Sequence, residues 1–120
     1  AAALASLDIL EEPGVYERVF AQADKLREGL QKVFDDERMG IRVIGEGPMW
    51  HMLFTDKVPV NWRDVLAADS KKLAAMEVEL IRNGLFVLPQ NRRFISIRHT
   101  DDDLEATFEA ARRASRSLKA

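Results

Sequence analysis

The stretch that decides the fold is IRVIGEGPMWHMLFT, residues 41–55, where the apolar pattern changes from a helical period to an extended one. Residues 41–44 and 49–55 read as two strands, because the four residues between them, GEGP, are typical of a turn. Side chains alternate along a strand, so the second strand presents two faces. One face carries Trp50, Met52 and Phe54, and the other carries Met49, His51 and Leu53. Since both faces are largely apolar, the pattern predicts a central strand that is covered on both sides.

Helical patterns stand on both sides of this hairpin. Residues 2–11 predict a short helix that ends at EEPG, because Pro13 disfavours helix in the residue before it. A second helix begins near Pro13 and runs to Asp36. Its apolar residues recur at every third or fourth position: Val15, Val19, Ala23, Leu26, Leu30 and Val33. A third helix begins after Asn61, a good N-cap residue, and ends at Gly84.

The C-terminal part of the chain adds two short extended runs and a last helix. LFVL (85–88) and FISI (94–97) predict two strands joined by PQNRR. Thr100, followed three residues later by Asp103, has the spacing of a capping box and predicts the start of a helix. Together these patterns predict an α+β fold, in which a small antiparallel sheet is packed by long helices.

Composition narrows the classes of function. The chain has 120 residues, enough for a single domain with its own core. Its net charge is −2, which argues against nucleic acid as a partner. The lack of cysteine excludes disulfides and thiolate chemistry within the chain. No apolar run is long enough to cross a membrane and no segment directs export, so we expect no membrane partner and a cytoplasmic location.

Three groups of polar residues were candidates for chemistry. DDD (101–103) reads as a helix cap rather than a cation site, because hard cations need ligands that converge from several loops. Ser96, His99 and Asp101 contain the side chains of a hydrolytic triad, but their spacing is expected to place Ser96 and His99 on opposite faces. His51 is predicted to be a hydrogen-bonded core or interface histidine, since no second histidine or cysteine shares its spacing.

The lysines are a separate question, because a lysine that forms a Schiff base needs a desolvated pocket that lowers its pKa. All six fall on charged helix faces, in a turn or at the end of the chain: Lys25, Lys32, Lys57, Lys71, Lys72 and Lys119. The residues alone therefore predict no catalytic, cofactor or metal site that this chain completes by itself.

The order of three segments carries a resemblance. ALASLDILEEPGVYERVFAQADKLREGL is followed by VIGEGPMWHMLFTD and then by GLFVLPQNRRFISIRHTDDDLEATFEAAR. In this order they resemble the C-terminal part of the class III, fold type I, pyridoxal-phosphate (PLP) aminotransferases. Within that class they look like the glutamate-1-semialdehyde aminomutase-like and β-amino-acid aminotransferase-like members. The resemblance covers essentially the whole chain, and the GxGPMWHMLFTD strand together with the HTDDDLEATFEAA ending is its most specific part.

The resemblance implies a single domain, residues 1–120, cut from a longer enzyme. Residues 1–12 would end a helix that leads from a missing large domain, and residues 13–120 would be the aminotransferase small domain. In the family the cofactor lysine and the phosphate-binding groups lie in that large domain. The resemblance therefore implies PLP in the intact enzyme and none bound to this chain, which would be inactive alone.

The intact enzyme that the resemblance implies is a homodimer. It would transfer an amino group between an amino acid and a keto acid or aldehyde. The alternative is a free-standing α+β interaction or ligand-binding module without catalytic activity.

Two neighbouring arginines are the candidates for substrate binding. In many family members an arginine just ahead of the last strand binds the substrate carboxylate, and the resemblance places Arg93 at that position with Arg92 beside it. The aminomutase branch often lacks this arginine, so its presence favours a transaminase that acts on an amino acid. A planar guanidinium can hold a carboxylate through two parallel hydrogen bonds. The competing interpretation is that both are solvated loop residues, and Arg98, past the strand, serves as the control.

Overall fold

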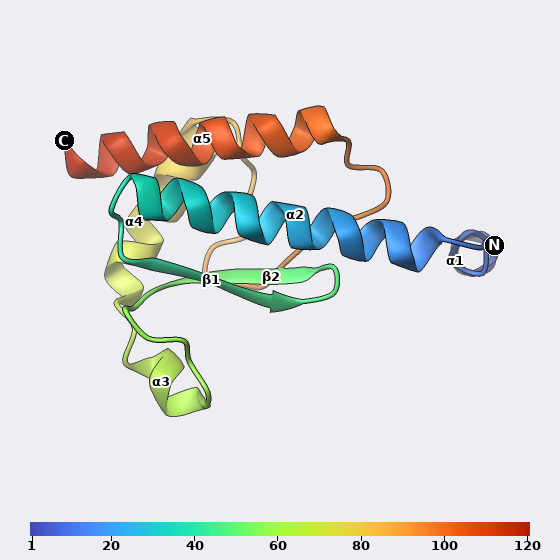
Figure 1. The fold of residues 1–120 in the computed structure, drawn as a ribbon, viewed down its shortest axis with the longest axis horizontal. Helices are drawn as coiled ribbons and strands as arrows, with labels where there is room; N and C mark the ends of the chain where they lie inside the picture. The colour runs from blue at the N-terminus through green and yellow to red at the C-terminus, as the bar shows by residue number, and fades with distance from the viewer.

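A computed structural model describes residues 1–120 as helices on a small antiparallel sheet (Figure 1). In chain order the elements are α1 (Ala2–Leu10), α2 (Val15–Asp36), β1 (Ile41–Glu46), β2 (Met49–Phe54), α3 (Trp62–Leu66), α4 (Ser70–Arg82), β3 (Arg93–Phe94) and α5 (Asp101–Lys119). The predicted α+β class is confirmed. None of the helices combines the length and the apolar character needed to cross a membrane.

The sheet is built on the predicted hairpin. β1 and β2 pair antiparallel from Ile41 opposite Phe54 to Glu46 opposite Met49, and the strand order β1-β2-β3 makes β2 central, as expected. Gly45 has φ +150°, and a Cβ atom there would lie 2.1 Å from the carbonyl oxygen of Met49. Only glycine fits that approach, so the position of this residue fixes where the hairpin turns.

One face of the hairpin is covered by α2, while α4 packs against β2 and α5 runs beside α2 on the side away from the sheet (Figure 1). Trp50, Met52 and Phe54 point into the core there, against the apolar stripe of α2. The two helices approach closely at Gly29, where a Cβ atom would lie 2.2 Å from the Phe108 ring. The core thus lies between the sheet and the helices α2, α4 and α5.

The opposite face of the hairpin is only partly covered. Leu53 is buried, but Met49 and His51 are half-buried and Phe94, which pairs with Met49, is 64% exposed. In Figure 1 α3 lies on this side, and Ser70 and Leu73 of α4 line a hollow there with His51 and Leu53. Coverage of both faces was predicted from the apolar pattern, and within this chain it holds only near Leu53. An apolar sheet face that its own domain leaves open is a surface available to another unit.

The region from Asn61 to Gly84 forms two helices, where the sequence predicted one. Asn61 caps α3 with a capping box closed by Asp64, and the helix ends after one turn. The backbone N–H of Asp69 then donates to the carbonyl of Phe54 at 3.1 Å, while its side chain accepts from the Lys72 N–H and caps α4. Bonding to the sheet at Asp69 therefore stops one helix and starts the next.

The prediction of strands at 85–88 and 94–97 was wrong over most of their length. Residues 85–88 are irregular, and of 94–97 only Phe94 belongs to a strand, β3. Val87 and Ile95 are buried members of the core, so their apolar character serves packing rather than strand pairing. Extended apolar runs look alike in sequence whether or not a neighbouring strand is available to pair with them.

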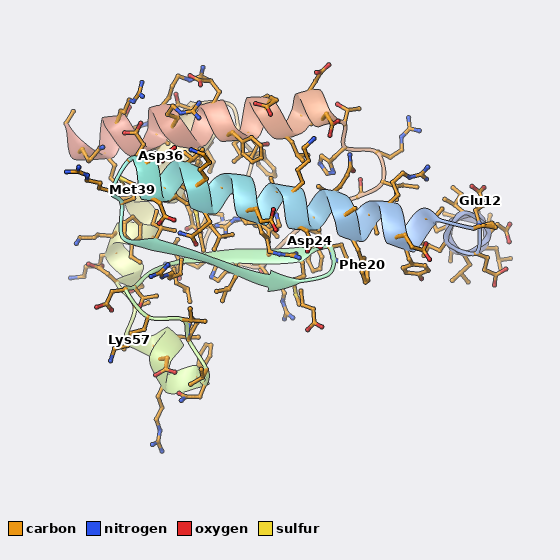
Figure 2. The ribbon with its side chains drawn as sticks, in the orientation of Figure 1. Glu12, Phe20, Asp24, Asp36, Met39 and Lys57 are labelled. Atoms are coloured by element: carbon orange, nitrogen blue, oxygen red, sulfur yellow. The ribbon has the colours of Figure 1, made fainter.

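The two ends of the chain differ. α5 starts with the predicted capping box, in which Thr100 and Asp103 bond each other reciprocally. α1 has no buried residue and packs against α2. Figure 2 shows Glu12 beside α1 at the opposite end of α2 from Asp36. The N-terminal helix therefore projects from the domain, whereas α5 is part of its core.

Candidate functional site

Arg93 lies in the short strand β3, opposite Trp50 of β2, and is only 6% exposed. Its guanidinium carbon is 5.3 Å from the centre of the Trp50 ring, within the range of a cation–π contact. One terminal nitrogen, Nη2, donates to a carboxylate oxygen of Glu77, and the other, Nη1, donates to Nδ1 of His51 at 2.8 Å. The third nitrogen, Nε, is buried without a partner. Arg93 is therefore held by three side chains from two elements.

Glu77, on α4, is the buried carboxylate of this cluster, with 1% of its surface exposed. Both of its oxygens accept the backbone N–H of Gln90, at 2.9 and 3.0 Å. Gln90 has φ +55°, a left-handed conformation that non-glycine residues seldom adopt. Glu77 thus neutralises Arg93 and also holds the turn before β3. A buried carboxylate needs both kinds of partner to offset its desolvation.

His51 completes the cluster as a neutral acceptor. Burial, and then the nearby Arg93 charge, hold the pKa of His51 below its ordinary value of 6.5. A neutral imidazole can accept at Nδ1, which is the role that the Arg93 contact requires. The prediction of a hydrogen-bonded histidine is confirmed. Burial also lowers the pKa of Arg93 while Glu77 raises it, and the guanidinium stays charged.

Arg92, the second predicted arginine, has the opposite surroundings. It is exposed, and its backbone N–H donates to Asn91 Oδ1, while its guanidinium forms no ion pair in the chain. Arg92 and Arg93 both line a groove of about 350 Å³. Most of the groove is apolar, with Trp50, Phe86, Leu88, Phe94 and His99 among its lining residues. The structure brings the two arginines to one groove but leaves only Arg92 without a charged partner.

The Ser96–His99–Asp101 group does not form a triad. Contrary to the expectation of opposite faces, His99 Nδ1 accepts the backbone N–H of Ser96 at 2.9 Å and lies 3.3 Å from its hydroxyl. The chain turns back at residues 97–98, which brings the two side chains together. Asp101 instead pairs with Lys25 at 2.8 Å. No carboxylate of the group orients His99, so the hydroxyl has no activated base.

The comparisons of this chain with known proteins agree with one another. The chain matches no family model. It is 35% identical over 112 residues to a glutamate-1-semialdehyde 2,1-aminomutase from Methanococcoides burtonii, covering 92% of this chain and 26% of that protein. A second aminomutase, from Desulfitobacterium hafniense, is 31% identical over 120 residues, covering 98% of this chain and 28% of the relative. The chain is homologous to one segment of the glutamate-1-semialdehyde aminomutases.

Solved structures show that the aminomutase-like segment shares its fold with transaminases. An omega-transaminase from Sphaerobacter thermophilus superposes with a TM-score of 0.76 at 16% identity, covering 91% of this chain and 25% of that one. A β-phenylalanine aminotransferase from Variovorax paradoxus gives 0.71 at 18% identity, covering 78% and 22%. The resemblance to the C-terminal part of PLP-dependent aminotransferases, expected from the sequence, is confirmed. The chain spans about a quarter of the length of these relatives.

The lysines of this chain do not fit a PLP site. All six are exposed. Four of them face carboxylates at the surface, in the pairs Lys25–Asp101, Lys32–Asp36, Lys72–Asp69 and Lys119–Glu37. None lines the arginine groove. A Schiff base to PLP needs a desolvated amine, so these residues do not supply one.

Glu77 was not predicted from the sequence. It lies on the inward side of α4, between Leu73, Met76 and Leu80, all of them buried. A single carboxylate inside an apolar helical stripe was the available signal, because an acid buried there needs a cationic partner. The pattern could not indicate which arginine that partner was.

Proposed function

We propose that this chain is the C-terminal small domain of a PLP-dependent aminotransferase or aminomutase, active only when joined to a larger domain. The proposal rests on the homology of this chain to a segment that makes up about a quarter of the length of the aminomutases. The exposure of every lysine supports it, since the cofactor must then be held by residues outside this chain. In the intact enzyme PLP would supply the electron sink for amino transfer.

The role that we propose for this chain is to bind the carboxylate of an amino-acid substrate through the Arg92–Arg93 pair. The support is the groove itself, which places two guanidinium groups beside an apolar lining. An apolar wall strengthens a charge-assisted hydrogen bond by excluding water from it. Such a pair favours a transaminase that acts on amino acids over an aminomutase.

We further propose that the larger domain packs against the open face of the sheet. Phe94 and Met49 lie on this face, and beyond it Val60, Trp62 and Leu66 are 84, 69 and 66% exposed. Large apolar side chains gathered on one side usually mark an interface. The homodimer that the family resemblance implies and the cytoplasmic location expected from the sequence belong to the same proposal for the intact enzyme.

The coding sequence upstream of Ala1 gives the first test. We expect it to encode a large domain that ends in a strand bearing the cofactor lysine. A start codon immediately before Ala1 would instead support a free-standing interaction or ligand-binding module.

The isolated chain gives a second test, by absorbance titration with PLP. We expect no saturable aldimine band. A band that disappears when one particular lysine is replaced would overturn the proposal, because it would place the cofactor on this chain.

A third test concerns the open sheet face. We expect the isolated chain to self-associate through it in sedimentation experiments. Replacing Trp62 and Leu66 by Ser should shift the chain towards monomer, while the matched exposed change Val78→Ser on α4 should not. A native chain that stays monomeric at high concentration would count against this face as an interface.

A further inference from the structure

The strand β1 is an edge strand, because the sheet order β1-β2-β3 leaves one side of it without a neighbouring strand. The backbone N–H of Thr55 donates to the carbonyl of Gly40, so residue 40 faces β2. The direction of the backbone groups alternates along a strand, and residues 41, 43 and 45 therefore direct their N–H and C=O groups outward. Such an outward row can pair with a strand of another molecule.

The side chain of Gln31 covers the middle of this outer edge. Gln31 belongs to α2, which packs against β1 (Figure 1). Its Nε2 donates to the carbonyl of Ile41 at 2.9 Å, and its Oε1 accepts the backbone N–H of Val43 at 2.8 Å. One side-chain amide thus bonds a carbonyl and an N–H two residues apart, which are groups that the backbone of a neighbouring strand would otherwise bond.

The amide of Gln31 is held in the orientation that these two bonds require. Its Nε2 also donates to Asp35 Oδ1, one turn further along α2, at 3.0 Å. A reversed amide would place its oxygen against the Ile41 carbonyl and the Asp35 carboxylate, and its NH2 group against the Val43 N–H. Three contacts therefore favour one orientation, and it is the orientation that completes the hydrogen bonds of the strand.

The edge beside Gln31 is otherwise open to solvent. A groove runs along it between α2 and the loop at Val58 and Pro59, and Val43 and Gly45 are among its lining residues. Gly45 is exposed, and Val58 is 68% exposed. No other side chain bonds the outward backbone groups of residues 41–45. Without Gln31 these groups would face an accessible groove with no partner in the chain.

We propose that Gln31 guards the edge of the sheet: by bonding Ile41 and Val43, it prevents β1 from pairing with β1 of a second copy of this chain. Every contact involved lies within the chain, so this role does not depend on the proposed function. The guarded edge is also distinct from the open sheet face. That face would associate through apolar side chains, whereas two β1 edges would associate through backbone hydrogen bonds about a two-fold axis.

Amide hydrogen exchange at Val43, measured by NMR in dilute samples, tests the contact directly. Gln31→Leu keeps a side chain of similar size on α2 but removes both hydrogen bonds to β1. We expect the Val43 N–H to exchange about tenfold faster than in the native chain, the effect of one lost hydrogen bond. The Ile44 N–H faces β2 and should keep its rate. An unchanged rate at Val43 would overturn the role of Gln31.

Sedimentation tests the consequence for association, in a Trp62→Ser, Leu66→Ser background that removes the contribution of the open sheet face. We expect Gln31→Leu to convert this background into a dimer at high concentration, in which the Val43 N–H is again protected. Gln22→Leu is the matched control, because it is the same substitution on the same helix at a side chain whose Oε1 has no partner. It should leave the background unchanged. A Gln31→Leu chain that stays monomeric at high concentration would show that the edge needs no guard.

Two further variants show whether the new dimer uses the edge. Proline has no N–H, and at an outward-facing position of an edge strand it leaves the pairing with β2 intact. Val43→Pro, added to Gln31→Leu, should therefore return the chain to monomer. Gln31→Ala, which adds no apolar side chain and favours helix, should dimerise as Gln31→Leu does. A dimer that persists with Val43→Pro, or a monomeric Gln31→Ala, would assign the association to another surface and overturn the proposal.

Discussion

Glu77 and Glu37 are two carboxylates that each join distant parts of the chain, one inside the protein and one at its surface. Glu77 holds Arg93 and the turn at Gln90 in the interior. Glu37, at the C-terminal end of α2, accepts from Arg116 at 2.9 Å and from Lys119 at 3.0 Å on α5. The chemistry is the same, but the two cations of Glu37 are about half exposed or more, whereas the single cation of Glu77, Arg93, is buried.

The difference in exposure between the two clusters shows that an ion pair constrains the fold when it is buried. Water screens the Glu37 cluster and can replace either partner, so losing one contact leaves no unsatisfied charge. The Glu77 cluster has no such substitute, and each member requires the others. The buried cluster therefore determines the path of residues 89–94, whereas the surface cluster only ties two helices that already pack together.

Arg93→Met is the substitution that we expect to have the largest effect, and it tests whether the buried pair constrains the fold. The change leaves Glu77 ionised and unpaired in the interior, so we expect a loss of about 3–5 kcal/mol in the free energy of unfolding, measured in urea. Arg92→Met, one residue away and exposed, is the control and should change it by about 0.5 kcal/mol or less. Adding Glu77→Gln to Arg93→Met should recover part of the loss. Similar small losses for both single variants would show that the pair is not buried in solution.

The pH dependence of His51 gives a second, smaller effect. Its pKa in the folded chain lies below 6.5, so between these two values the unfolded chain binds a proton that the folded chain does not. The contribution of neutral His51 to stability is therefore present above about pH 6.5 and is lost as pH falls through the lowered pKa. Urea unfolding from pH 7.5 to 5 should show this loss, and His51→Gln should remove it. If the stability of the His51→Gln chain fell equally with pH, another group would be the cause of the loss.

Thr100→Ala tests a third carboxylate, Asp103, which is exposed and bonded locally. The backbone N–H of Thr100 is the main cause that lowers the pKa of Asp103, and the Thr100 hydroxyl oxygen accepts the backbone N–H of Asp103 at the helix start. Removing the hydroxyl should cost about 1 kcal/mol of unfolding free energy, the usual value for an N-cap. Ser117→Ala, on the exposed side of α5, is the matched control and should be close to neutral. A neutral Thr100→Ala would mean that the backbone contact alone sustains the cap.

The smallest effect is expected at the surface pair. The hydrogen bond from Lys119 is the main cause that lowers the pKa of Glu37 below its ordinary value of 4.5, so its contribution is present above pH 4.5 and is lost as pH falls through the lowered pKa. Glu37→Gln should have a small effect on stability at pH 7 that fades further at 1 M salt, because both cations are exposed. The effect of Arg93→Met should persist at the same salt concentration. An equally salt-dependent loss in both would remove the distinction between the two clusters.

Local patterns were sufficient for several elements. The α2 stripe, the hairpin at GEGP and the capping box at Thr100 appear in the structure as predicted. Each depends on residues a few positions apart, so the same chemistry operates before and after folding. Both predicted arginines also line the groove, because they are adjacent residues at the point where the chain enters β3.

What the sequence by itself determined was therefore the class of fold, the periodic faces of its helices and the region of the candidate site. Only the tertiary structure decided that Arg93 is neutralised by Glu77, 16 residues away, and contacts His51, 42 residues away. The break at Asp69 and the irregular path of residues 85–88 were decided in the same way, by backbone bonds to the sheet and by core packing. A side chain's partner across such distances depends on how complete elements pack, and no short-range pattern encodes that choice.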